Sequence, residues 1–107
     1  MANKHLEAAK ELAKLSRSRQ KHGAIVVRNG QVVSAGVNIS KGTADVHWPL
    51  ASEHAEERAI SQAGKEARGA TLYVARVNRL GEARLSRPCE RCQSAIRKSG
   101  IARIVHT

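Results

Sequence analysis

The sequence predicts an α/β fold with three layers, in which helices cover both faces of one sheet. Two Val- and Ile-rich runs meet at Asn29 and Gly30, a dipeptide typical of a tight antiparallel hairpin. The rest of the chain alternates helix, strand, helix and strand, which predicts parallel pairing through right-handed crossovers. The chain has 107 residues, the length of one ordinary domain. We therefore expect a single domain over residues 1–107.

The first predicted element is a helix that follows Asn3, a suitable N-cap, and continues to about Leu15. Its apolar positions recur at helical spacing: they are Leu6, Ala9, Leu12, Ala13 and Leu15. Residues 16–21 then form a polar and basic link. Residues 24–28 and 31–37 form the two strands of the hairpin.

The middle of the chain predicts a loop, a helix and a central strand. Residues 38–50 lose the strand pattern, as expected of a surface loop that lines a site. Ser52 suits the N-cap of a helix that ends at Gly64. Residues 71–77 have apolar side chains on both alternating faces, which indicates a strand covered on both sides. Residues 78–87 form an irregular or hairpin-like excursion.

The last part of the chain predicts a helix and a short strand. Pro88 suits the first position of this helix, which ends at Gly100. Three residues then fall on one helix face: Cys89, Cys92 and Ile96. Residues 101–106 form the closing strand.

Composition limits the partners and the compartment. The chain has 19 Lys and Arg against 9 Asp and Glu, and its net charge of +10 favours anionic partners such as nucleotides or nucleic acid. A basic surface without a particular partner is the alternative. Two cysteines cannot form a disulfide framework, and neither a secretion signal nor a membrane-spanning run is present in the sequence. We expect a cytoplasmic protein, in which a CxxC pair binds metal or is redox-active.

Two short motifs carry the chemistry. The first contains His54, Ala55 and Glu56, and the second contains Cys89 and Cys92 with two residues between them. One imidazole and two thiolates are ligands suited to zinc, and three protein ligands leave a tetrahedral ion one open position for water. Glu56 lies two residues from His54, so its carboxylate is free to carry protons.

The two motifs meet if the two helices that contain them start at the same edge of the sheet. The positive ends of the helix dipoles then lower the cost of holding thiolates at Cys89 and Cys92. Water on zinc loses a proton near neutral pH, so the site would supply a hydroxide nucleophile. This is the inventory of a hydrolytic site.

His-x-Glu followed by Pro-Cys-x-x-Cys resembles the zinc-dependent cytidine and deoxycytidylate deaminase superfamily. The hairpin before the first motif, the run from Gly69 to Val74 and the dipeptide Gly100 and Ile101 resemble the family in order and spacing. The resemblance covers about residues 22–107. It implies a cytidine-deaminase-like sheet with an antiparallel first hairpin, truncated to four strands because the family usually adds further elements after the last one. The truncation would leave the substrate pocket without one wall, which a second subunit of a homo-oligomer would supply.

The resemblance also implies the roles of single residues. His54, Cys89 and Cys92 would bind zinc, and Glu56 would be the catalytic acid and base. The expected substrate contacts are Asn38, Ala55 and Trp48. Asn38 resembles an asparagine that contacts the sugar, whereas Trp48 would stack on the base, close the pocket or only pack. The reaction would convert an amino-bearing ring carbon to a carbonyl and release ammonia.

Several alternatives remain open at this point. A structural zinc site in a nucleic-acid-binding module needs a fourth ligand, which His22, His47 or His106 would provide. A redox-active pair at Cys89 and Cys92 leaves His54 and Glu56 without a role. Within the deaminase reading, the preferred substrate is the cytosine of a free nucleoside or nucleotide. Single-stranded DNA or RNA is the next candidate, followed by adenine or guanine, because one Trp and one Tyr offer little stacking surface to an extended strand.

Overall fold

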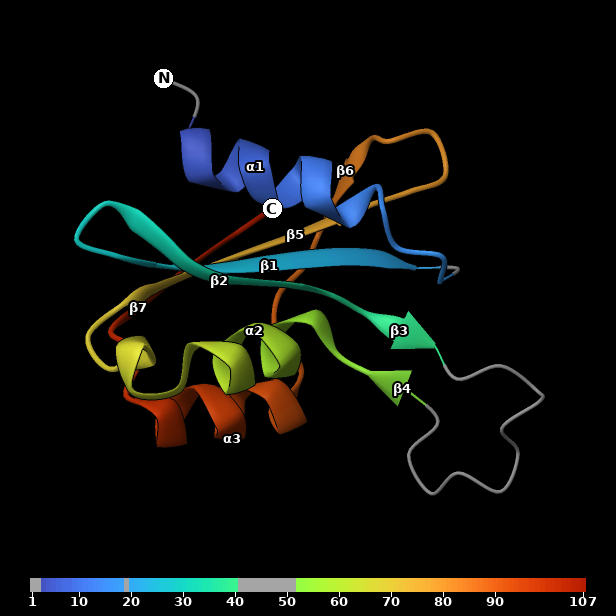
Figure 1. The fold of residues 1–107 in the computed structure, drawn as a ribbon. Coiled ribbons are helices and arrows are strands. Elements are labelled where there is room, and N and C mark those ends of the chain that lie inside the picture. Colours follow the sequence, from blue (N-terminus) through green and yellow to red (C-terminus); the bar gives the residue numbers. More distant parts are fainter. Residues whose placement is uncertain (1–2, 19, 41–51) are drawn as a thin grey trace.

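A computed structural model of the chain describes residues 3–18, 20–40 and 52–107, and it confirms the predicted three-layer α/β class. Figure 1 shows the sheet between two helical layers, with α1 (Lys4–Ala13) on one face and α2 (Ala55–Ala63) and α3 (Glu90–Ser99) on the other. No helix in these ranges is long and apolar enough to cross a membrane.

The main sheet of the described residues has five strands. They are β1 (Lys21–Arg28), β2 (Gln31–Val37), β5 (Thr71–Val77), β6 (Ala83–Arg84) and β7 (Arg103–His106). The order is β2-β1-β5-β6, and β7 also pairs with β5. β1 is antiparallel to both β2 and β5, so β2 and β5 point the same way, and β7 is parallel to β5 as predicted. Two short strands, β3 (Ile39–Ser40) and β4 (Ser52–Glu53), form a separate ladder.

The hairpin between β1 and β2 has the predicted turn. Arg28 pairs with Gln31, and the two residues between them, Asn29 and Gly30, have positive φ angles of 52° and 78°. Two successive positive φ angles are the geometry of a type I′ turn, which Asn-Gly adopts at little cost. β1 begins at Lys21, three residues before the predicted start.

β5 is the central strand, as its two apolar faces predicted. Leu72 and Val74 pack in the cluster beneath α2 and α3, whereas Tyr73 and Ala75 pack in the cluster beneath α1. The prediction of four strands lacked β6. This two-residue strand and β7 share one edge of β5, with β7 along residues 71–74 and β6 along residues 76–77. The sheet therefore has four positions across its width, with β6 and β7 sharing the outermost one, and the excursion around Gly81 is a hairpin.

α1 begins where the sequence predicted and ends earlier. The Asn3 side chain accepts hydrogen bonds from the backbone N–H groups of His5 and Leu6. The helix ends at Ala13, and Leu15, which was expected to widen the apolar stripe, is 72% exposed. The chain turns toward β1 after Ala13, so Leu15 does not reach the sheet.

The predicted starts of the other two helices were wrong. Ser52 lies in β4, and His54 is the N-cap of α2. Pro88 lies before the helix rather than in its first position, because Cys89 is the N-cap of α3. Each helix thus starts at a residue of the predicted metal site. The predicted C-terminal glycines, Gly64 and Gly100, do cap their helices.

Candidate metal centre and active site

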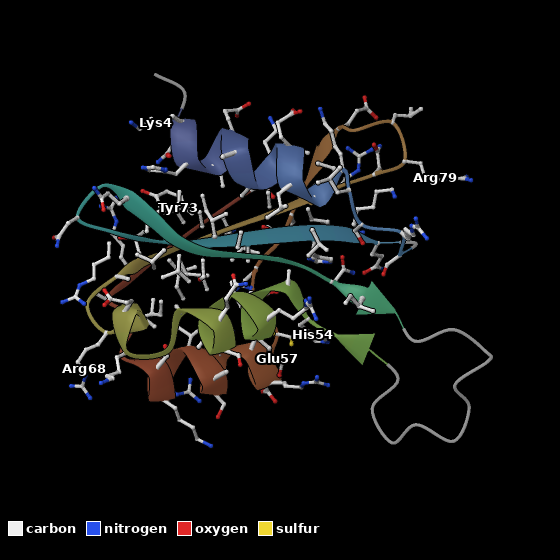
Figure 2. All side chains as sticks on the ribbon, in the orientation of Figure 1. Lys4, His54, Glu57, Arg68, Tyr73 and Arg79 are labelled. Carbon is white, nitrogen blue, oxygen red and sulfur yellow. The ribbon has the colours of Figure 1, made fainter. Side chains whose placement is uncertain are left out.

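The three predicted zinc ligands meet between the first turns of α2 and α3. His54 has extended backbone angles at the N-cap of α2, and Cys89 has them at the N-cap of α3. Cys92 lies in the first turn of α3. Figure 2 shows His54 and Glu57 at the same end of α2, beside α3. This end follows the carboxyl end of β2, where ligand sites of α/β sheets commonly form.

The distances between the donor atoms fit a tetrahedral ion. His54 Nδ1 lies 3.0 Å from Cys92 Sγ and 3.6 Å from Cys89 Sγ. All three donor atoms lie within 4.8 Å of one another. Zinc bonds of about 2.0 Å to nitrogen and 2.3 Å to sulfur place tetrahedral ligands roughly 3.5 to 3.8 Å apart. The 3.6 Å separation lies in this range and the 3.0 Å separation is shorter, so small side-chain shifts would let the three residues hold zinc, with Nδ1 as the histidine donor.

The two thiols have different surroundings. Cys89 is exposed, whereas Cys92 is fully buried, and both are free cysteines. Burial raises the pKa of the Cys92 thiol strongly, and the neighbouring Glu56 carboxylate raises it further. A cation held by the three ligands offsets both effects, because it stabilises the thiolate. The donor set thus favours a metal ion over a reactive, unbound thiolate at Cys92.

Glu56 is a buried carboxyl group beside this centre, with only 5% of its surface exposed. Burial raises its pKa above the usual range, although hydrogen bonds to its own backbone N–H and to the Cys92 side chain oppose the shift. A raised pKa brings a carboxyl group closer to neutral pH, where it can both accept and donate a proton. This is the environment expected of a proton carrier.

The sequence analysis missed a salt bridge between the two helix starts. The Arg91 guanidinium donates from Nε to Glu57 Oε2 and from Nη2 to Glu57 Oε1, each at 2.7 Å. Glu57 Oε1 also accepts from the His54 backbone N–H at 3.4 Å, as in a capping box. Two signals were available in the sequence: an acid three residues after His54 and a cation between the two cysteines.

Asn38, the expected sugar contact, is held by its neighbours. Its Oδ1 accepts from Ser16 Oγ at 2.7 Å and from the His22 backbone N–H at 2.9 Å, while its Nδ2 donates to Gln20 O at 2.6 Å. It lines a cavity of about 310 Å³ together with Ser16 and Arg17. The cavity also borders Ile39, which pairs with Glu53, the residue before His54.

The remaining predicted residues have simple positions. Ala55 is fully buried as the first residue of α2. Trp48 lies outside the described residues, as does His47, one of the suggested fourth ligands. Among the residues that the structure describes, the metal-binding group has three members, and neither His22 nor His106 joins it. The fourth tetrahedral position is not taken by a described His, Cys, Asp or Glu.

Comparison with known sequences gives a family and a set of relatives. The whole chain, residues 1–107, matches the family described as the cytidine and deoxycytidylate deaminase zinc-binding region. A curated relative is the riboflavin biosynthesis protein RibD of Aquifex aeolicus, 36% identical over 89 residues, which are 78% of this chain and 20% of that protein. The chain spans about a fifth of the length of the first curated relatives it matches.

Solved structures share the fold. A dCMP deaminase of the cyanophage S-TIM5 superposes with a TM-score of 0.74 at 23% identity, over 96% of this chain and 77% of that chain. A diaminohydroxyphosphoribosylaminopyrimidine deaminase and 5-amino-6-(5-phosphoribosylamino)uracil reductase of Thermotoga maritima gives a TM-score of 0.62 at 27% identity. This match covers 94% of the chain and 27% of the Thermotoga protein.

Proposed function

We propose, from the premise that the chain belongs to the zinc-binding cytidine and deoxycytidylate deaminase family, that it hydrolyses the amino group of a pyrimidine nucleoside or nucleotide. A ring carbon would exchange its amino group for the oxygen of water and release ammonia. The observation that carries the proposal is the buried Glu56 carboxyl group beside the three ligands of one metal centre.

In this proposal His54 Nδ1, Cys89 Sγ and Cys92 Sγ hold the ion. When bound, zinc supplies the Lewis acidity that makes water a nucleophile near neutral pH. The first turns of α2 and α3 hold the three residues in place. Cys92 is fully buried, so bulk water does not reach it. The exposed side of the site, at Cys89, leaves a route for a substrate.

Glu56 moves the protons. Its carboxylate takes a proton from the attacking water, gives it to the ring nitrogen, and passes a second proton to the departing amine. The raised pKa supports this cycle, because the same group must be a base in one step and an acid in the next. No other described acid or base of the centre combines such burial with a position next to the ligands.

The preferred substrate is a free cytosine nucleoside or nucleotide. The cavity beside Asn38 is compact, and the basic chain favours a phosphorylated ligand. Tyr73 is not available for stacking on a base, because it packs beneath α1 against His5, on the opposite face of the sheet (Figure 2). This makes an extended single strand of DNA or RNA a less favoured substrate, because such a strand needs several aromatic rings for stacking. Asn38 and Ala55, together with Trp48, keep their proposed role as substrate contacts.

A second candidate substrate is an aminopyrimidine linked to ribose phosphate. Three curated relatives, at 35% to 38% identity, are riboflavin biosynthesis proteins RibD. The name of the Thermotoga protein specifies a deaminase for a phosphoribosylaminopyrimidine. Both candidates carry an amino group on a pyrimidine carbon, so the proposed proton transfers are the same. Self-association and a cytoplasmic location complete the proposal.

A substrate panel tests the proposal. Zinc-loaded protein is given cytidine, deoxycytidine, their monophosphates, the phosphoribosylaminopyrimidine, guanine, and single-stranded DNA and RNA, with ammonia as the readout. We expect release from at least one free pyrimidine nucleoside or nucleotide. Release only from a polymer or only from guanine would overturn the substrate class, and release from none would overturn the proposed activity.

A further inference from the structure

The zinc site is divided between two segments that are far apart in the sequence. His54 belongs to the start of α2, and the two cysteines belong to the start of α3. Bonds from zinc to its ligands vary in length by only about 0.2 Å. The relative position of the two helix starts therefore decides how well the three donor atoms fit the ion.

One salt bridge joins the two starts directly. Glu57 is the third residue after His54, and Arg91 lies between Cys89 and Cys92. The two side chains meet in a parallel pair of hydrogen bonds at 2.7 Å, and Glu57 also contacts the His54 backbone N–H. The Glu57 carboxylate thus contacts the backbone of His54 on α2. It also binds Arg91, which lies in the turn of α3 that contains the two cysteines.

We infer that the Glu57–Arg91 pair is a positioning device for the metal centre, which holds the α2 ligand at the correct distance from the two α3 ligands. The inference rests on the zinc site of the proposed function. A bidentate guanidinium–carboxylate pair fixes both distance and orientation, which a single contact does not. In this proposal both residues act through the ligands, because the Glu57 carboxylate accepts hydrogen bonds from Arg91 and from the His54 backbone.

The exposure of the pair separates this role from general stabilisation. The side chains of Arg91 and Glu57 are 44% and 27% exposed. Most salt bridges this accessible to water add little to the stability of a fold, and even a bidentate pair adds a modest amount. Loss of the pair should therefore weaken zinc binding far more than it weakens the zinc-free protein.

The chain offers a matched control. Arg28 and Glu66 form a salt bridge at 3.0 Å between β1 and the 3₁₀ turn η2 (Gly64–Ala67), with side-chain exposures of 43% and 58%. It contains the same two residue types, and its arginine is as exposed as Arg91, although Glu66 is more exposed than Glu57. Arg28 lies at the hairpin end of β1, away from the end where Lys21 and the zinc site lie. Variants of this pair change surface charge without changing the spacing of the ligands.

The experiment measures zinc affinity by competition with a chelator, without substrate. Glu57→Gln and Arg91→Lys should each weaken binding about 10- to 100-fold, as is typical when a group that orients a ligand is lost. Arg91→Lys keeps the positive charge beside the cysteines and removes the planar fork. The double variant should lose no more zinc affinity than the single variant with the larger loss, because the two residues act as one unit. Arg28→Lys and Glu66→Gln should leave the affinity unchanged.

Two further measurements exclude a purely structural effect. The midpoint of thermal unfolding of zinc-free protein should be the same in the Glu57 and Arg91 variants as in the two controls. The visible spectrum of cobalt-loaded protein, which reports the geometry of the ligands, should change only in the Glu57 and Arg91 variants. Because no substrate is used, failure of the proposed deamination would show in the ammonia assay and not here.

The inference is overturned if Arg91→Lys binds zinc as tightly as the unchanged protein, since the charge of Arg91 would then be sufficient. It is equally overturned if the losses in the single variants add in the double variant. It also fails if the zinc-free variants are destabilised in proportion to their loss of affinity, because the pair would then be a general support of the fold.

Discussion

The two helical layers of this protein are built from similar materials and do different work. On both faces of the sheet, small residues let a helix approach a strand closely: α1 lies against Gly23 of β1, and α2 lies against Gly36 of β2. On the α1 side, the described residues form an apolar cluster with the helix packed over it. On the α2 and α3 side, the apolar cluster supports helix starts that carry a histidine, two cysteines and a buried acid.

The difference shows which part of a helix carries packing and which part carries chemistry. β1 contributes alternate residues to the two layers, with Ala24 and Val26 beneath α2 and α3, and Ile25 and Val27 beneath α1. The sheet therefore offers a similar apolar surface to both helical layers. The chemistry arises at the N-termini of α2 and α3, whose ligand residues replace ordinary capping side chains. Substitutions that affect only one of the two layers test this division between packing and chemistry.

The largest effect is expected from Cys92→Ala. Cys92 is the buried ligand, so its loss should remove both bound zinc and deamination. A substitution in the other layer, Leu6→Ala, removes packing beneath α1 and should cost up to about 3 kcal/mol in the free energy of unfolding. Metal analysis should find one zinc per chain in Leu6→Ala and almost none in Cys92→Ala. Equal zinc content in both would end the comparison.

Glu56→Gln should come next in size. It removes the proposed proton carrier and keeps the proposed zinc ligands, so turnover should fall roughly 100- to 10,000-fold while zinc content stays the same. Glu66→Gln makes the same chemical change at an exposed position and should leave turnover unchanged. Steady-state ammonia release from metal-analysed samples measures both. Near-normal turnover in Glu56→Gln would remove Glu56 from the mechanism.

The two glycines at the helix contacts give a smaller and more selective effect. A Cβ on Gly23 would lie 2.5 Å from the Ala9 carbonyl oxygen, and one on Gly36 would lie 3.0 Å from the Ala55 carbonyl oxygen. Gly23→Ala should therefore cost more stability, about 1–3 kcal/mol or more, by moving α1. Gly36→Ala should cost less stability but weaken zinc binding, because it moves the first turn of α2.

Denaturant unfolding of zinc-free protein and chelator competition measure these two quantities for each glycine variant. The comparison of the layers predicts opposite rankings, with Gly23→Ala more damaging to stability and Gly36→Ala more damaging to zinc affinity. If Gly23→Ala weakens zinc binding as much as Gly36→Ala does, the α1 layer contributes to the site and the separation of roles is wrong.

The smallest effect concerns pH. Burial, with further contributions from Arg76 and His54, lowers the pKa of the His22 imidazole below its usual value of 6.5. The unfolded chain then binds the proton more tightly, so the stability linked to His22 is present above that value and is lost as the pH falls through the lower, folded pKa. His22→Gln should make the unfolding free energy of zinc-free protein less sensitive to mild acid. An unchanged pH dependence would contradict this prediction.

Local sequence patterns predicted the parts of this structure that local physics decides. Asn29 and Gly30 specify a turn by their own backbone preferences, and the two-faced apolar run of β5 specifies a central strand. The three residues of the candidate zinc site were found because the spacing of their motifs requires few assumptions about the fold. The N-cap predicted at Ser52 and the first helical position predicted at Pro88 were misplaced, because the N-caps are His54 and Cys89, residue types that are not typical caps.

Contacts between distant segments could not be read from the sequence. Glu57 and Arg91 are 34 residues apart, and only the packing of α2 beside α3 brings them together. β6 is too short to leave a strand pattern, because two residues show no alternation. Asn38 was assigned to a substrate, yet its hydrogen bonds to Ser16, Gln20 and the His22 backbone depend on a loop whose path the sequence does not indicate.

The central claim is that one zinc centre with Glu56 beside it performs hydrolytic deamination, and turnover in heavy-oxygen water tests it most directly. Zinc-loaded protein is incubated with the nucleoside and nucleotide panel in labelled water, and ammonia and the product base are quantified by mass spectrometry. We predict equal amounts of ammonia and of a product whose new carbonyl carries the heavy oxygen. Ammonia without label in the product, or no ammonia from any member of the panel, would contradict the account.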